Sequence, residues 1–338
     1  MNALQYKILN KYLEYIIKQA NKTFDYYVKN HSTLYSMNNF FYDYITSIIN
    51  YNPYELPLEI NINNNELLSM AREVIESINH EYLKKFDEYV KYDCIKIDKD
   101  LKSVYKVFSD NIEIERTNNY ENVATIVHEF IYSLTYTPNS SINSRILSEM
   151  MAIYYELYTI DYLIDIKKIN PKFIDYNFRL RNTIDCTELI NEYSIIILAY
   201  QAFGKLDKNK IENISSYLNN FDLEQFRDKS TKLFNEMSFT NNIRDNLLLA
   251  EDIFGSYEYL YSTLLAFYNR EKLTIEEMNT LLYNINEYEH YFVNELLMEY
   301  GIDINDKYEF CKYSKKGISN YLNNVYKSLK LKEKIKVR

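Results

Sequence analysis

Apolar residues recur every three or four positions along most of the chain, which is the spacing of an amphipathic helix. The expected helices cover residues 1–29, 35–49, 66–92, 118–136, 144–166, 186–203, 207–218, 222–237, 242–269, 274–300 and 306–330. Asn118 is expected to cap the helix that follows it, with Glu121 three residues on. Gly301 stands where the residue after a helix end belongs. The pattern therefore predicts a mainly α-helical protein.

Two stretches interrupt the helical pattern. The prolines of the segment 52–57 oppose a helix there. Further on, Ile112 and Ile114 alternate with Glu113 and Glu115, which is the two-residue period of a half-buried strand. The expected fold class is thus mainly α with a small β element near residues 107–116.

Composition narrows the fold further. The 338 residues include only 4 glycines and 4 prolines. No GxGxxG or GxxxxGK[ST] string is present, so loops that cradle a phosphate are not expected. Folds built from many turns are not expected either. We expect a helical lobe over residues 1–92 and a second helical domain over residues 93–338, which together can form one compact unit.

Charge and cysteine usage bear on partners and location. The net charge of −9 argues against nucleic acid as the main partner. The 3 cysteines lie far apart and have no metal-type spacing, which favours free thiols in a reducing compartment. The N-terminus lacks the apolar core of a signal peptide, and the longest apolar run, Ser194–Phe203, is too short to span a bilayer. We therefore expect a cytoplasmic protein that engages no membrane.

One His-Glu pair has surroundings that suggest chemistry. In an HExxH helix, two imidazoles four residues apart bind zinc and the glutamate acts as general base. Here His128-Glu129 begins such a string, but Tyr132 stands in the second histidine position. The next expected helix carries Glu149 and Glu156, about two turns apart and therefore on one face. A carboxylate from a following helix is the third ligand of a His2Glu zinc site, and another carboxylate can orient the histidine.

At this point the chain resembles a family of zinc peptidases, the thimet oligopeptidase and oligoendopeptidase F group. NYENVATIVHEF at 119–130 is similar to the approach into the family's HExxH helix, and SEMMAIYYE at 148–156 is similar to its Glu-x-x-Ser-x-x-x-Glu string. GSYEYLYSTLLAFY at 255–268 looks like its tyrosine-rich substrate helix, and ELLMEYGIDINDKYEF at 295–310 resembles its C-terminal stretch. The four matches occur in the family's order and imply a helical zincin-like catalytic domain.

The resemblance implies a role for each residue of the zinc site. His128 would be the first zinc ligand and Glu149 the carboxylate ligand. Glu129 would be the base that deprotonates a zinc-bound water, and Glu156 would buttress a histidine ligand.

The resemblance also implies residues that handle the substrate. Tyr259, with Tyr257 beside it, would donate to the oxyanion of the tetrahedral intermediate. The strand residues Ile112, Glu113 and Ile114 would form an edge that pairs with an extended peptide.

Departures from the family pattern leave three hypotheses open. Tyr132 is a poor zinc ligand, and Ile131 replaces the glycine that usually precedes the second histidine, so incomplete zinc occupancy is expected. The first hypothesis is a protein that binds short peptides or an extended polypeptide segment, with hydrolysis impaired or lost. The second is an active zinc oligopeptidase with a non-standard ligand set, and the third is a helical scaffold without chemistry. Separation of His128 from Glu149 by more than about 8 Å would exclude the first two, because zinc bonds are about 2 Å long.

Overall fold

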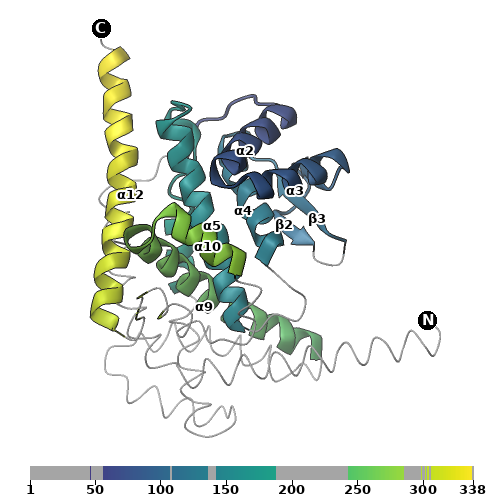
Figure 1. Cartoon of the computed structure of the whole chain (residues 1–338), viewed down its shortest axis with the longest axis vertical. Helices are drawn as coiled ribbons and strands as arrows, with labels where there is room; N and C mark the ends of the chain where they lie inside the picture. The colour runs from purple at the N-terminus through teal and green to yellow at the C-terminus, as the bar shows by residue number, and fades with distance from the viewer. Residues whose placement is uncertain are drawn as a thin grey trace, which may run out of the picture. The chain divides into compact units, whose positions relative to one another are not determined.

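The chain divides into two compact units in the computed structural model (Figure 1). The structure describes residues 46, 56–106, 109–135, 142–187, 243–284, 298, 301, 303 and 306–336. One unit comprises Met1–Tyr51 with Asn182–Leu260, and the other comprises Asn52–Arg181 with Tyr261–Arg338. The domain boundary expected after residue 92 falls inside the second of these units, which also contains most of the described residues.

Two helices joined by a single residue are the first elements of the second unit that the structure describes. Asn63 and Glu66 form a capping box at the start of α2 (Asn64–Ile78), in which each side chain bonds the other residue's backbone N–H. Asn79 then ends α2 in an extended conformation and caps α3 (His80–Lys91) by accepting from the backbone of its first turn. The single long helix expected here is therefore two helices, because Asn79 serves as the boundary of both.

A three-stranded sheet follows α3. Its strands are β1 (Ile95–Asp98), β2 (Val104–Lys106) and β3 (Asn111–Glu115), in the order β1-β3-β2. β3 pairs with β1 in parallel and with β2 in the antiparallel sense. The β element predicted near 107–116 is confirmed, and Ile112 and Ile114 are fully buried as their alternation predicted. The expectation that this strand is an edge is wrong, because β3 has a neighbour on each side.

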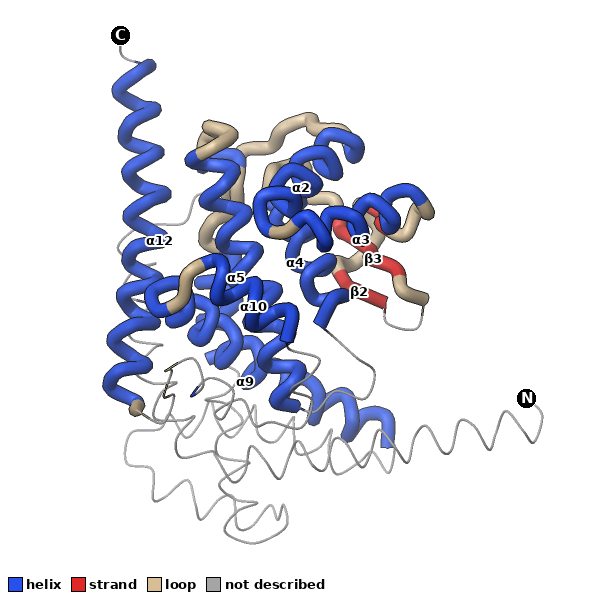
Figure 2. Tube along the Cα trace, in the orientation of Figure 1, coloured by secondary structure: helices blue, strands red, loops and turns tan. Residues whose placement is uncertain are grey.

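The next two helices form the centre of the unit. α4 (Glu121–Thr135) packs against α5 (Ile142–Asp165) on one side and against β2 and β3 on another, as Figures 1 and 2 show. The start of α4 is capped by Asn119, whose side chain accepts from the backbone N–H of Glu121 at 2.7 Å. The expected cap, Asn118, instead has a φ of 48°, which turns the chain into the helix.

Three helices complete the described part of the chain. α9 (Ile243–Lys272), α10 (Ile275–Asn284) and α12 (Lys307–Lys336) correspond to predicted helical segments. Between them, Gly301 has a φ of 71°, as expected for a residue that follows a helix. A short 3-10 helix, η1 (Pro171–Phe173), follows α5 and contacts α12. The mainly helical fold class is confirmed for the described residues.

Several predicted helices lie outside or largely outside the residues that the structure describes. They are the segments 1–29, 35–49, 186–203, 207–218 and 222–237 and the second half of 274–300. Among the helices that are described, none is both long enough and apolar enough to cross a membrane.

Candidate functional site

The candidate site lies where α4 and α5 face each other. α4 is buried on nearly all sides because it is packed between α5 and the sheet, so polar side chains on it must find partners inside the protein. His128 and Glu129 come from α4, and Glu149 and Glu156 come from α5 two turns apart. All of these side chains are buried. The packing of two helices thus collects one imidazole and three carboxyl groups in the core.

The imidazole of His128 is held between two carboxylates. Its Nε2 atom lies 3.6 Å from Oε1 of Glu149, and its Nδ1 atom lies 3.0 Å from Oε2 of Glu156. The separation that would have excluded a peptidase-like arrangement, about 8 Å, is therefore not found. Glu156 stands where a carboxylate that orients a histidine belongs.

A fifth residue, Arg179, joins this group from the helical segment 178–187. Its Nε donates to both carboxylate oxygens of Glu156, at 2.7 and 2.9 Å, and a terminal nitrogen also bonds the same carboxylate. That nitrogen lies 3.0 Å from Nδ1 of His128, and the other terminal nitrogen lies 3.9 Å from Oε1 of Glu149. The guanidinium therefore contacts three members of the group at once.

Sequence reasoning missed Arg179. No motif includes it, and it lies on a different segment from the His-Glu string. One signal was present, namely two arginines, Arg179 and Arg181, close together in a chain that otherwise favours lysine. Arginine is preferred over lysine for buried, bidentate carboxylate pairs, so this choice could have indicated a buried ion pair.

Burial and neighbouring charges set the protonation of the group. Burial alone would raise the pKa of Glu156, but the Arg179 guanidinium and His128 outweigh it and lower that pKa to about 2. Burial opposes a charge on His128, yet the facing carboxylates of Glu149 and Glu156 raise its pKa. Burial raises the pKa of Glu129, and Glu149 adds to this effect. The site therefore favours an ionised Glu156 paired with a permanent cation.

Glu129 connects the buried group to the sheet. The backbone of Tyr105 in β2 faces its carboxylate and lowers its pKa, against the effect of burial. In a strand ladder, the N–H and C=O of one residue point to the same side, and those of its neighbours point to the other. Ile112, the register partner of Tyr105, donates its N–H to Cys94 on the β1 side, so Tyr105 directs its backbone groups away from β3, toward the outer edge of the sheet. The site thus adjoins the outer edge of β2, whereas the sequence had suggested β3 as the strand that binds a peptide.

A zinc ion is the cofactor that the resemblance implies, and the residues fit it only in part. Two ligands of one tetrahedral zinc, each bonded at about 2.0–2.2 Å, lie about 3.4 Å apart, close to the 3.6 Å between His128 Nε2 and Glu149 Oε1. Glu149 Oε1 is also buried without a hydrogen-bond partner.

The rest of the coordination sphere is missing in the described part of the chain. There, no three His, Cys, Asp or Glu side chains are arranged so that they could hold a metal ion. Tyr132 occupies the second histidine position on α4 and is partly exposed. Arg179 places a positive charge beside the two available donors. These residues do not form a zinc site.

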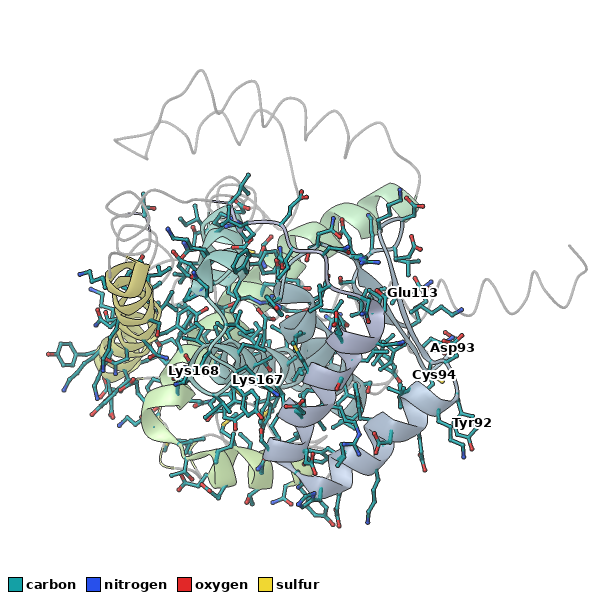
Figure 3. The ribbon with its side chains drawn as sticks, turned by 90° about the horizontal axis from the view of Figure 1, so that it is seen from above. Tyr92, Asp93, Cys94, Glu113, Lys167 and Lys168 are labelled. Carbon is teal, nitrogen blue, oxygen red and sulfur yellow. The ribbon has the colours of Figure 1, made fainter. Side chains whose placement is uncertain are left out.

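The remaining predicted residues lie elsewhere. Tyr259 is on α9, with 41% of its surface exposed, and belongs to the first unit, whereas the buried group belongs to the second. The side chain of Tyr257 is outside the described residues. Glu113 on β3 forms an ion pair of 2.6 Å with Lys106 on β2. Figure 3 shows Glu113 near Cys94, at the sheet.

Comparison with protein-family models, with curated proteins and with solved structures found no match for this chain.

Proposed function

We propose that this protein binds short, extended peptides along the outer edge of β2, on a peptidase-like arrangement of α4 and α5 in which hydrolysis is impaired or lost. The observation that carries the proposal is the packing of α4 against β2, where the Tyr105 backbone faces the buried Glu129 carboxylate. This packing brings a sheet edge and the His-Glu helix to the same place.

The edge of β2 suits the backbone of an added strand. An extended peptide binds a sheet edge through its main-chain carbonyl and N–H groups. The Tyr105 N–H on this edge faces the Glu129 carboxylate, so a peptide carbonyl that accepts from this N–H would lie beside the buried group. On the opposite side of the sheet, the Asn64 side chain covers the Ile97 carbonyl of β1 with a bond of 3.1 Å. The β2 edge is therefore the better docking site of the two.

The composition of the buried group supports binding without efficient cleavage. Peptide hydrolysis by the implied family needs three protein ligands on its metal. Here His128 and Glu149 face each other, but Tyr132 takes the place of the other histidine. Glu156 is paired with Arg179, and Glu149 lies 3.9 Å from the same guanidinium. Carboxyl groups that would serve a metal are thus held by an arginine.

Binding is tested with fluorescently labelled peptides of eight to ten residues of mixed sequence, followed by anisotropy. Tyr105→Pro removes the outward backbone N–H while leaving the bonds to β3 in place, and proline is tolerated at such edge positions. This variant should bind peptides at least about tenfold more weakly, which corresponds to one backbone hydrogen bond of about 1.4 kcal/mol. Tyr105→Phe keeps the N–H and serves as the matched control, with wild-type affinity expected.

Two outcomes would contradict the proposal. If wild-type protein binds none of these peptides, the helical scaffold without a peptide site becomes the better hypothesis. If both Tyr105 variants bind as wild type does, the peptide docks elsewhere.

Cleavage is measured separately, with internally quenched peptides and with Glu129→Gln as the comparison. We expect no measurable cleavage by either protein. Cleavage that is lost only in the Gln variant would instead establish an active peptidase.

A further inference from the structure

We infer that Arg179 takes the place of a metal ion in this site: its guanidinium is the permanent cation that holds His128, Glu149 and Glu156 together, and it excludes zinc. This inference does not depend on peptide binding. The positive charge of Arg179 allows His128, Glu149 and Glu156 to lie together in a folded core without a metal ion.

The guanidinium of Arg179 lies where it contacts His128, Glu149 and Glu156. Arg179 is 7% exposed and is bonded in a fork to Glu156. From there its two terminal nitrogens extend to His128 Nδ1, at 3.0 Å, and to Glu149 Oε1, at 3.9 Å. A metal ion would interact with the same histidine and the same Glu149 oxygen. Arginine stays charged at every accessible pH, so its charge is a fixed property of the site.

The surroundings of His128 also exclude a metal from one side of the ring. A terminal nitrogen of Arg179 and Oε2 of Glu156 both lie 3.0 Å from Nδ1. These two groups are bonded to each other as well. Nδ1 is therefore enclosed by the ion pair, and only Nε2, which faces Glu149, is left for a metal.

The positive charge of Arg179 would also repel a metal ion bound here. A divalent ion bonded to both His128 Nε2 and Glu149 Oε1 would lie within a few ångströms of the Arg179 nitrogens. Like charges at this range repel strongly in a buried environment, where water screens little. The missing second histidine lowers the affinity for a metal further. Arg179 opposes metal binding even though His128 Nε2 and Glu149 Oε1 are well placed as ligands.

Zinc affinity of the full chain tests the inference, measured by competition with a chromophoric chelator using Zn²⁺ alone. Arg179→Met should bind Zn²⁺ about 10–100-fold more tightly than wild type, the range found for groups that surround metal ligands. Arg181→Met is the matched control, because Arg181 pairs with Asp175 on the same helical segment and does not contact His128. Its affinity should equal that of wild type. With Co²⁺, only the Arg179 variant should show visible absorption bands of a bound ion.

Removal of one partner from a buried ion pair can prevent folding. The double variant Glu156→Gln/Arg179→Met removes both charges of the pair and should show the same gain in Zn²⁺ affinity. The wild-type protein gives a test that needs no variant: its thermal unfolding midpoint should not change with a chelator or with added Zn²⁺, since a bound ion stabilises the folded state. Stabilisation of wild type by Zn²⁺, or equal affinities in wild type and a folded Arg179→Met variant, would overturn the inference.

Discussion

Substitution of Gly317 by alanine sets two well-defined effects against each other. Gly317 lies on α12 where that helix crosses α9, and a Cβ atom built on it would lie 2.1 Å from the Phe267 carbonyl oxygen and 2.8 Å from the carbonyl carbon. The obstacle is backbone, so no side-chain rotation can relieve it. The two helices would have to separate by about 1 Å to restore a normal contact.

The separation would disturb a well-packed interface. Ser314 Oγ donates to the Leu264 carbonyl at 3.1 Å across the same crossing, and the rings of Phe267 and Tyr321 lie 5.9 Å apart. Overpacking of this kind costs about 1–3 kcal/mol, and loss of the buried Ser314 bond would add about 1 kcal/mol. The higher helix propensity of alanine returns about 1 kcal/mol. We therefore expect Gly317→Ala to lower the free energy of unfolding by about 1–3 kcal/mol.

Gly255→Ala on α9 provides the matched control. Among the described residues, no heavy atom lies within 4 Å of a Cβ built on Gly255, so only the propensity effect of about 0.5–1 kcal/mol remains and this variant should be more stable than wild type. Urea unfolding followed by circular dichroism measures both variants. If Gly317→Ala proves as stable as wild type or more so, the close crossing of α9 and α12 is wrong.

Tyr132→His should raise the affinity for zinc, because it supplies the second imidazole of the HExxH pair. Wild-type protein should contain less than one zinc per chain, and full occupancy on metal analysis would contradict that expectation. The pKa of Glu156 is lowered from 4.5 to about 2 in the folded protein. At any pH above 4.5 this group therefore stabilises the fold by up to about 3 kcal/mol. Urea unfolding at a series of pH values should show this stabilisation being lost as the pH falls through 2. Glu121 behaves oppositely, because burial raises its pKa to about 8. The contribution of Glu121 to the free energy of unfolding is complete below pH 4.5 and is lost as the pH rises through 8. Glu121→Gln should remove this loss of stability. If the variant and wild type show the same dependence of stability on pH, Glu121 is solvated.

The helices of the described region were largely readable from the sequence, because each buries one face and the apolar spacing reports that face directly. The boundary at Asn79 was missed for a physical reason. The side chain of Asn79 accepts from the backbone N–H of Glu81, and this capping interrupts the helix without breaking the apolar spacing. Asn119 replaced Asn118 as a cap for a similar reason, because several polar residues in a row compete for the same role.

Part of the candidate site was also readable. The spacing of Glu149 and Glu156 placed both on one face of a helix, and the His-Glu string supplied the residue they surround. The short distances between His128 and these carboxylates show that the three side chains do come together. Arg179 was not readable, because an ion pair between residues separated by 23 positions leaves no local pattern.

Within the described part of the chain, the sequence by itself determined which segments are helical, which of their faces are buried, and that Ile112 and Ile114 belong to a strand. These features follow from interactions among near neighbours in the chain. The tertiary structure alone decided that β3 is central, because the order of strands depends on how β1 and β2 fold back on it. It also decided that a guanidinium, and not a second imidazole, completes the buried group around His128. Both outcomes depend on contacts between distant segments, where packing and charge compensation in the core select the partner.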